Sequence, residues 1–364
     1  MKNYENVKKV LQGYVDNNEI AGASIIIQEG DEVVLKAGVG WQDAEKQIAV
    51  DEHTIFMLAS MTKPVTAAAV MILSDEGKLD IEDSFGKYLP EYVGTDKENI
   101  QILHLLNHSC GLGMIMHPGM VQAMMLSDAE HDRLADRVSR WKELTPDFPA
   151  GTATGYSPAV GFDIAGRIVE VVSGMELDEF FRKRIFEPLG IKDMTFLLNE
   201  EQKTRKSIMF HDKKLDEVPT PADFKDLDSF ADASLAGYFC GAAGLFGTAE
   251  DYNKIVQMYA HDGYYNGVQL LKKETVQRMH TASNDLEAKP GVRWGLGMQV
   301  FGKPEETGIF VNEGSYSWSG AYGTHFFIDP KEDRTFILMI NSDNLGGSES
   351  YVSRAVEKAI WEAR

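Results

Sequence analysis

The sequence is poor in several features, and each shortage excludes a class of protein. Its 364 residues include two cysteines, Cys110 and Cys240, which fit a reduced protein better than a disulfide scaffold. The 36 Lys and Arg residues face 56 Asp and Glu residues, and the net charge of −20 opposes binding to nucleic acid or to an anionic membrane. No apolar run is long enough to span a bilayer. The composition is that of an acidic globular protein.

Motifs of several enzyme classes are also missing. No Gly-x-Ser-x-Gly segment occurs, which excludes the nucleophile elbow of the α/β-hydrolases, and no glycine-rich phosphate loop is present. His104 and His108 are four residues apart but lack the glutamate of zinc proteases, so we expect packing and loop hydrogen bonds there and no metal site. Residues 1–7 show no signal-peptide pattern, and we expect a cytoplasmic protein.

The predicted elements place strands near both ends of the chain and helices between them. We expect helices over 4–18, 159–173 and 349–362, and hairpin strands over 23–28, 33–38, 324–329 and 334–341. This order indicates an α+β fold, in which an antiparallel sheet built from both ends of the chain is flanked by the N- and C-terminal helices.

The length allows two domains. We expect a discontinuous sheet domain formed by residues 1–78 and 236–364, and a large, mainly helical inserted domain over residues 79–235. The active site would lie in the cleft between the two domains.

Ser60 and Lys63 form the most informative local pattern. Their spacing puts both side chains on one face of a helical turn. The residues that follow, 65–73, are almost wholly apolar, which is typical of a helix buried on all sides and would take Lys63 out of water. A catalytic serine needs a base within hydrogen-bond reach, and burial disfavours the charged form of lysine. Ser60 is therefore a candidate nucleophile and Lys63 its partner.

Two later segments add polar groups. Tyr156 lies on a Gly- and Pro-rich loop just before the helix expected over 159–173. Beside a lysine ammonium the Tyr156 side chain could exist partly as phenolate and shuttle a proton; alternatively it packs against that helix.

The segment Trp318-Ser319-Gly320-Ala321 leads into an apolar strand. An exposed amide there could help bind an oxyanion, or the glycine simply marks a bulge in the strand.

Taken together, the Ser-x-x-Lys, Tyr-Ser and glycine-containing segments resemble the serine β-lactamase/penicillin-binding protein superfamily, and most closely its class C β-lactamase-like (family VIII-type) esterases. The resemblance implies a β-lactamase-like fold, Ser60 as the acylated nucleophile, and Lys63 and Tyr156 in proton transfer. It also implies an oxyanion hole from the amides of Ser60 and Ala321, and no metal or organic cofactor.

Two departures from the family pattern bear on the substrate. Pro158 stands where the family usually has an asparagine that holds substrate amides, and proline cannot donate a hydrogen bond. Trp318 stands where lactamases usually have a cation for the substrate carboxylate, and Ser319 and Gly320 follow it. We place these four residues at the substrate-binding site, where an aromatic wall suits an uncharged acyl group.

The leading hypothesis is a serine hydrolase that forms a covalent acyl-enzyme, most simply a carboxylesterase for small or medium apolar acyl esters. A weak β-lactamase, a D-amino-acid peptidase or a penicillin-binding protein would use the same groups. An acyltransferase and a non-catalytic sensor are further alternatives. We expect a small-molecule ester or amide as the only partner, with no nucleic acid and no membrane; the oligomeric state stays open.

A methionine-rich run adds one more expectation. Met114, Met116, Met120, Met124 and Met125 could form a flexible lid over an apolar cleft, or they could be core residues. Because methionine readily fills irregular gaps in a protein interior, we favour the core.

Overall fold

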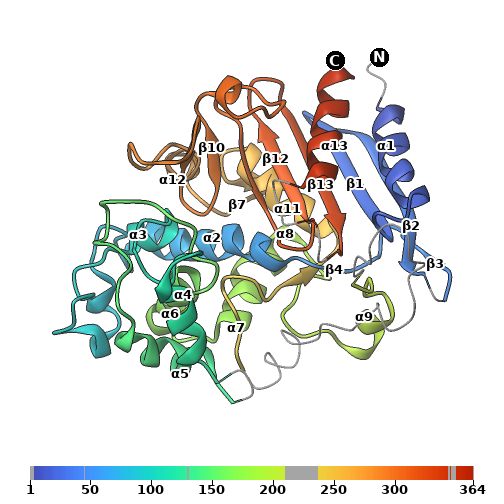
Figure 1. Ribbon diagram of the computed structural model, residues 1–364. Coiled ribbons are helices and arrows are strands. Elements are labelled where there is room, and N and C mark those ends of the chain that lie inside the picture. Colours follow the sequence, from blue (N-terminus) through green and yellow to red (C-terminus); the bar gives the residue numbers. More distant parts are fainter. Residues whose placement is uncertain are drawn as a thin grey trace.

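A computed structural model describes residues 4–44, 46–128, 131–209, 237–342, 345 and 350–363. Its main sheet has nine antiparallel strands in the order β3-β2-β1-β13-β12-β11-β10-β9-β8 (Figure 1). Their bounds are β1 Gly22–Glu29, β2 Glu32–Asp43, β3 Ile48–Ala49, β8 Glu287–Lys289, β9 Val292–Trp294, β10 Gln299–Phe301, β11 Tyr316–Ser319, β12 His325–Asp329 and β13 Arg334–Ile340. Since β1 pairs with β13, both ends of the chain build the centre of the sheet.

Helices cover both faces of this sheet. On one face, α1 (Glu5–Asp16) and α13 (Tyr351–Glu362) lie side by side (Figure 1) and share a core with Ile25 and Ile27. On the other face, α11 (Ala249–Ala260) and α2 (Thr62–Asp75) share a core with Ile26. Alternate residues of a strand point to opposite faces. The residues of β1 from Gly22 to Gln28 are all buried, including the polar Ser24 and Gln28, so both faces of this strand are covered.

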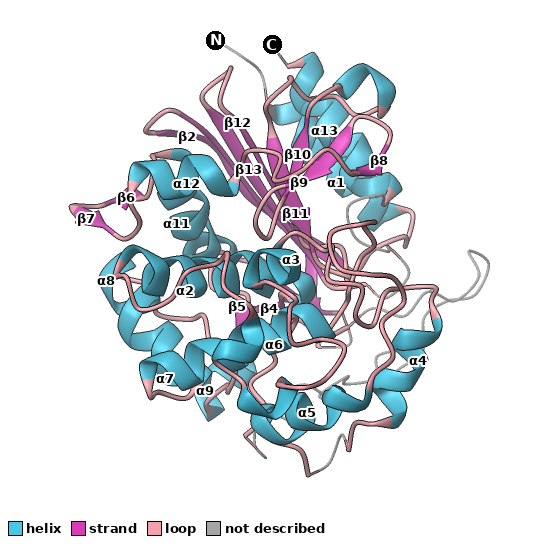
Figure 2. Ribbon diagram, turned by 90° about the vertical axis from the view of Figure 1, so that its left-hand side faces the viewer, coloured by secondary structure: helices cyan, strands magenta, loops and turns pink. Residues whose placement is uncertain are grey.

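The helical part of the chain lies beside the sheet, below it in Figure 1. Its helices are α3 Ile102–Leu106, α4 Pro118–Met125, α5 Leu134–Arg140, α6 Val160–Ser173, α7 Leu177–Phe181, α8 Glu187–Leu189 and α9 Glu200–Thr204. The helix α12 Lys273–Met279 belongs to the sheet side, as do the short hairpin strands β6 Tyr264–Tyr265 and β7 Val268–Gln269. Figure 2 shows α2 running between the sheet and the helical part.

A short strand pair positions the start of α2. Strand β4 (Phe56–Met57) pairs with β5 (Phe246–Gly247), and the amide of Leu58 donates to the carbonyl of Leu245 at 2.9 Å. A 3₁₀ turn over Ala59–Met61 follows, and α2 then runs through the core with its residues 62–73 all buried. Residues far apart in sequence therefore meet around Ser60.

The predicted α+β fold is confirmed. The helices expected over 4–18, 159–173 and 349–362 are α1, α6 and α13. The four expected strands are β1, β2, β12 and β13; three differ by a residue or two at their ends, whereas β2 continues to Asp43, well beyond the expected end at residue 38. The two-domain division stays a prediction, and its boundary at residues 235 and 236 lies outside the described residues. No helix in the described part of the chain has the length and apolarity needed to cross a bilayer.

The favoured core position for the methionine-rich run is wrong for most of its members. Met114 is fully buried, but Met116, Met124 and Met125 are 94%, 66% and 82% exposed. The reason is local: α4 buries its small residues, Gly119 and Ala123, against the protein.

Candidate active site

Of the three polar groups singled out from the sequence, Ser60 lies within hydrogen-bond distance of both Lys63 and Tyr156. Ser60 Oγ is 2.6 Å from Tyr156 Oη, and Lys63 Nζ donates to Ser60 Oγ at 3.2 Å. The ammonium also lies 5.0 Å from the centre of the Tyr156 ring. Ser60 and Tyr156 are partly exposed, so a substrate can reach the hydroxyl that stands between the other two groups.

Lys63 is completely buried, and backbone carbonyls hold it in place. Its Nζ donates to the carbonyl oxygens of Pro158 at 2.8 Å and Ala242 at 2.9 Å. With Ser60 Oγ, Lys63 therefore has three acceptors, one for each N–H donor of its ammonium group. Lys63 makes no ion pair with a carboxylate in the described part of the chain. The geometry thus suits a buried cation solvated by peptide dipoles.

Pro158 contributes through its backbone. Its carbonyl reaches Lys63, a contact that any residue could supply, whereas its ring replaces a side chain that could donate a hydrogen bond. A role for Pro158 in binding substrate stays a prediction.

The third motif is anchored to the segment that precedes Ser60. Thr324 Oγ1 donates to the carbonyl of Leu58 at 3.0 Å, and Gly320 N donates to the Thr324 carbonyl at 2.7 Å. A Cβ atom on Gly320 would lie 2.3 Å from the Leu58 oxygen, so only glycine permits this approach. Ala321 follows in an exposed turn, and no described residue accepts a hydrogen bond from its amide. The turn thereby presents a free donor near the Ser60 segment.

Ala59, directly before the serine, is in the left-handed region with φ 46°. A residue with a Cβ atom is uncommon in this conformation, which costs about 1–2 kcal/mol. Such strain is concentrated at functional sites, where the surrounding structure over-determines the backbone. Here the anchors on Leu58 and the buried helix α2 hold the Ser60 turn from both sides.

Trp318, expected from the sequence to form an aromatic wall, is buried, with 6% of its surface exposed. Its ring centre lies 5.4 Å from that of Tyr156 and 5.0 Å from that of Trp294. Its neighbour Ser319 is buried as well, with Oγ 2.6 Å from His325 Nδ1. The rings therefore form the apolar floor beside Tyr156, and any direct contact of Trp318, Ser319 or Gly320 with a substrate stays a prediction.

His108 supports the loop that carries Tyr156. Its Nδ1 accepts from Ser157 N at 3.2 Å, and its carbonyl accepts from Thr154 Oγ1 and Gly155 N, both at 3.1 Å. Burial and the nearby Lys63 cation hold the pKa of His108 well below its ordinary value. The ring is therefore neutral and keeps its proton on Nε2. The expected loop hydrogen bonds are present, while the positioning of Tyr156 by His108 was missed.

Asp163 on α6 is a second group that sequence reasoning missed. It is fully buried, and its carboxylate accepts from Ala242 N at 3.2 Å and from the Tyr238 hydroxyl. Ala242 thus donates to a carboxylate with its N–H and accepts from Lys63 with its carbonyl. Burial raises the pKa of Asp163. An aspartate among the apolar residues of a helix was the signal in the sequence.

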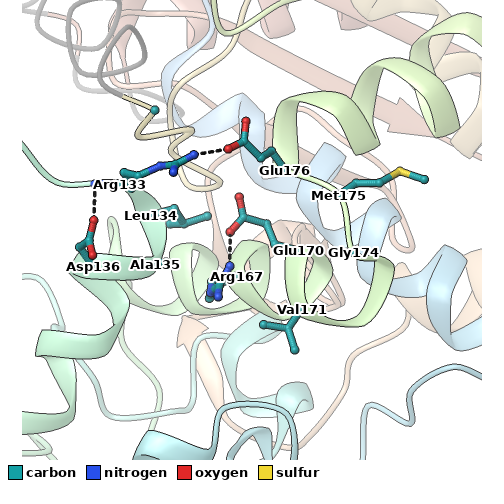
Figure 3. Close-up of a pocket in the computed structure, with 11 residues that line it drawn as sticks. Arg133, Leu134, Ala135, Asp136, Arg167, Glu170, Val171, Gly174, Met175 and Glu176 are labelled. Carbon is teal, nitrogen blue, oxygen red and sulfur yellow. Dashed lines mark hydrogen bonds and ion pairs between the residues drawn. The ribbon is translucent and has the colours of Figure 1, made fainter.

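The described residues hold no group of three His, Cys, Asp or Glu side chains arranged for a metal ion. A separate hollow of about 470 Å³ lies along α5 and α6 (Figure 3) and contains none of the groups around Ser60. Its guanidinium groups are already paired, Arg133 with Glu176 and Arg167 with Glu170. Paired charges leave little attraction for a ligand of either sign, and we assign no function to this hollow.

Comparison with known proteins identifies the family of the chain. The family model described as Beta-lactamase matches residues 7–359. The chain belongs to the beta-lactamase family. The resemblance to the serine β-lactamase/penicillin-binding protein superfamily is therefore confirmed.

Individual relatives of this beta-lactamase family member are named as different kinds of hydrolase. The chain is 27% identical to Esterase EstB from Burkholderia gladioli over 350 residues, which cover 89% of this chain and 86% of EstB. It is also 27% identical to a putative D-alanyl-D-alanine carboxypeptidase from Escherichia coli, covering 82% of this chain and 71% of that protein. The structure of EstCE1, a hydrolase with promiscuous acyltransferase activity, superposes with a TM-score of 0.86 at 23% identity over 98% of both chains.

The buried, neutral state of His108 predicts a loss of stability in acid. Below its ordinary pKa of 6.5 the histidine of the unfolded chain binds a proton that the folded one does not, so acid favours unfolding. Urea unfolding at pH 7.5 and 5.0 should show that the free energy of unfolding falls in acid, by up to about 1.4 kcal/mol per pH unit for this one histidine. The His108→Phe variant has no group to protonate there, so its free energy of unfolding should fall less between the two pH values. An unchanged pH dependence in the variant would contradict the assignment.

Asp163→Asn tests the bridge through Ala242. The variant keeps the size of the side chain and removes its charge. We expect kcat/KM for an ester to fall on the order of tenfold to a hundredfold, the scale of a lost charge interaction in a partly screened site.

The pH dependence of the stability of Asp163→Asn distinguishes a role of Asp163 in positioning Ala242 from a merely structural role. Because the folded-state pKa of Asp163 is raised, wild type loses stability relative to the variant as pH rises above 3.8. The free energy of unfolding of each protein should therefore be measured at pH 4 and pH 7. The difference between the variant and wild type should shift in favour of the variant at pH 7. A variant with full activity, or one that is inactive only because it is unfolded, would contradict this role.

Proposed function

We propose that the protein is a serine carboxylesterase that hydrolyses small or medium apolar acyl esters through a covalent acyl-enzyme. The observation that carries this proposal is the position of Ser60 Oγ, which contacts both Tyr156 Oη and Lys63 Nζ. A hydroxyl held between a proton acceptor and a buried cation has the arrangement that an activated nucleophile needs.

The first half of the reaction follows from these contacts. The oxygen of Ser60 attacks the ester carbonyl carbon as its proton passes to Tyr156, while Lys63 stabilises the negative charge shared by the two oxygens. The amides of Ser60 and Ala321 bind the oxyanion of the tetrahedral intermediate. Tyr156 then protonates the departing alkoxide, which leaves as an alcohol, and the acyl group stays on Ser60.

Water completes the cycle by the same route in reverse. It attacks the acyl carbon, gives its proton to Tyr156, and the carboxylic acid is released as Ser60 regains its proton. No metal or organic cofactor is needed in either half.

The choice of an ester over a lactam or peptide rests on two positions. Pro158 offers no side-chain donor for a substrate amide, and Trp318 adds an apolar ring where a cation would attract a carboxylate. The similarity to EstB supports the same choice. The similarity to the putative carboxypeptidase supports D-peptidase or β-lactamase activity as the second candidate.

Ser60→Ala tests the nucleophile. Intact-protein mass spectrometry of wild type with a fluorophosphonate should show one adduct at Ser60, alongside turnover of p-nitrophenyl butyrate. The variant should show neither, because no hydroxyl remains to be acylated. Nitrocefin provides the comparison: a long-lived adduct on wild type without ester turnover would favour a penicillin-binding sensor over an esterase.

Tyr156→Phe tests the proton carrier. The phenyl ring keeps the packing against Trp294 and Trp318, and only the hydroxyl is lost. Acylation measured in a stopped-flow burst should slow by about two to four powers of ten, the scale of a positioned acid or base. An unchanged acylation rate, with the same melting temperature, would move the proton transfer to Lys63 alone.

A further inference from the structure

Large apolar side chains gather on the surface at and before α4. Ile115 and Met116 precede the helix, and Val121, Met124 and Met125 lie on it; these five residues are called the α4 patch below. Their exposed fractions are 44%, 94%, 56%, 66% and 82%. Figure 2 shows α4 near the outer edge of the molecule. Contiguous exposed apolar side chains usually mark a binding surface.

The backbone holds the patch in this exposed position. Asp147 accepts from Met114 N through Oδ2 and from Gly119 N through Oδ1, both at 2.9 Å, and so ties Met114 to the first turn of α4. Met114 and Ala123 are buried and anchor the segment on either side. Ile115, Met116 and Val121 lie between these anchors. Met124 and Met125 follow Ala123 directly on α4, so the whole patch is displayed on a fixed backbone.

The patch is directly connected to the candidate active site. Ile115 N donates to the carbonyl of Tyr156 at 2.8 Å, so the patch begins beside the residue whose hydroxyl contacts Ser60. Gly155, the residue before Tyr156, packs against Met114: a Cβ atom there would lie 3.4 Å from the Met114 sulfur. An acyl chain attached to Ser60 thus has an apolar surface adjoining the same loop.

Charge is also consistent with this use. No Asp, Glu, Lys or Arg occurs between Glu98 and Asp128, in a chain of which a quarter of the residues are charged. The run has no charged side chain of its own, and the Asp147 carboxylate beside it already binds the backbone of Met114 and Gly119. The exposed apolar side chains therefore favour an alkyl chain over an ionic ligand. The net charge of −20 opposes the alternative of an anionic lipid surface.

We propose that the α4 patch binds the alkyl part of longer acyl esters and sets the preference for acyl-chain length. The inference rests on the proposed esterase function and extends it from small esters to esters of about eight carbons. Its residues determine specificity without taking part in the chemistry. Adaptable methionine side chains can pack along chains of different length.

The test compares p-nitrophenyl acetate, butyrate and octanoate. In wild type, kcat/KM should rise with chain length by roughly twofold to fourfold per methylene group, the scale of apolar burial. In Met116→Ser and in Met124→Ser/Met125→Ser the rise should flatten, while kcat/KM for acetate stays within about twofold of wild type. Val171→Ser, an exposed apolar position on α6 outside the patch, is the matched control and should keep the wild-type profile.

The outcomes distinguish the two proposals. Wild type and patch variants with the same chain-length profile, and full activity on acetate, would overturn the patch proposal and leave the esterase function standing. Absence of hydrolysis of every ester by wild type would overturn the esterase function. Light scattering that shows wild-type dimers and variant monomers, with unchanged profiles, would assign the patch to contacts between two copies and also overturn the proposal.

Discussion

The burial of one cation is the constraint on which the arrangement around Ser60 depends. Lys63 has no exposed surface, and a buried charge is tolerated only where polar groups replace the water it has lost. Those groups come from three distant parts of the chain: Ser60 itself, the carbonyl of Pro158 before α6, and the carbonyl of Ala242. Satisfying the ammonium therefore draws together the same segments that carry the nucleophile and its tyrosine.

Each of these segments has its own support. His108 binds the backbone of the loop that carries Tyr156, Asp163 accepts from the amide of Ala242, and Thr324 donates to the carbonyl of Leu58. Most of these contacts involve backbone groups. A site built this way depends on the path of the backbone more than on particular side chains, which is consistent with a family whose members share a fold and differ in substrate.

Much of the fold could be predicted because its signals are local. The apolar residues of β1 and the turn between β12 and β13 identify strands wherever they occur, and the spacing of Ser60 and Lys63 on a buried helix needs no distant partner. The roles of Asp163 and Ala242 could not be predicted in this way, since they depend on contacts between residues that are far apart in sequence. The methionine-rich run was misjudged because composition does not reveal which face of α4 is covered: its small residues face the protein, and its large ones face outward.

The pairing of β1 with β13 has a consequence for how the protein is made. The ribosome releases Gly22–Glu29 long before Arg334–Ile340 exists, so β1 waits without its central neighbour for most of synthesis. The core around α2 needs the completed sheet behind it, and contacts between such distant residues form slowly. The site around Ser60 is thus assembled only after translation has passed β13. Until then the apolar side chains of β1, Ile25, Ile26 and Ile27, lack the neighbours that bury them.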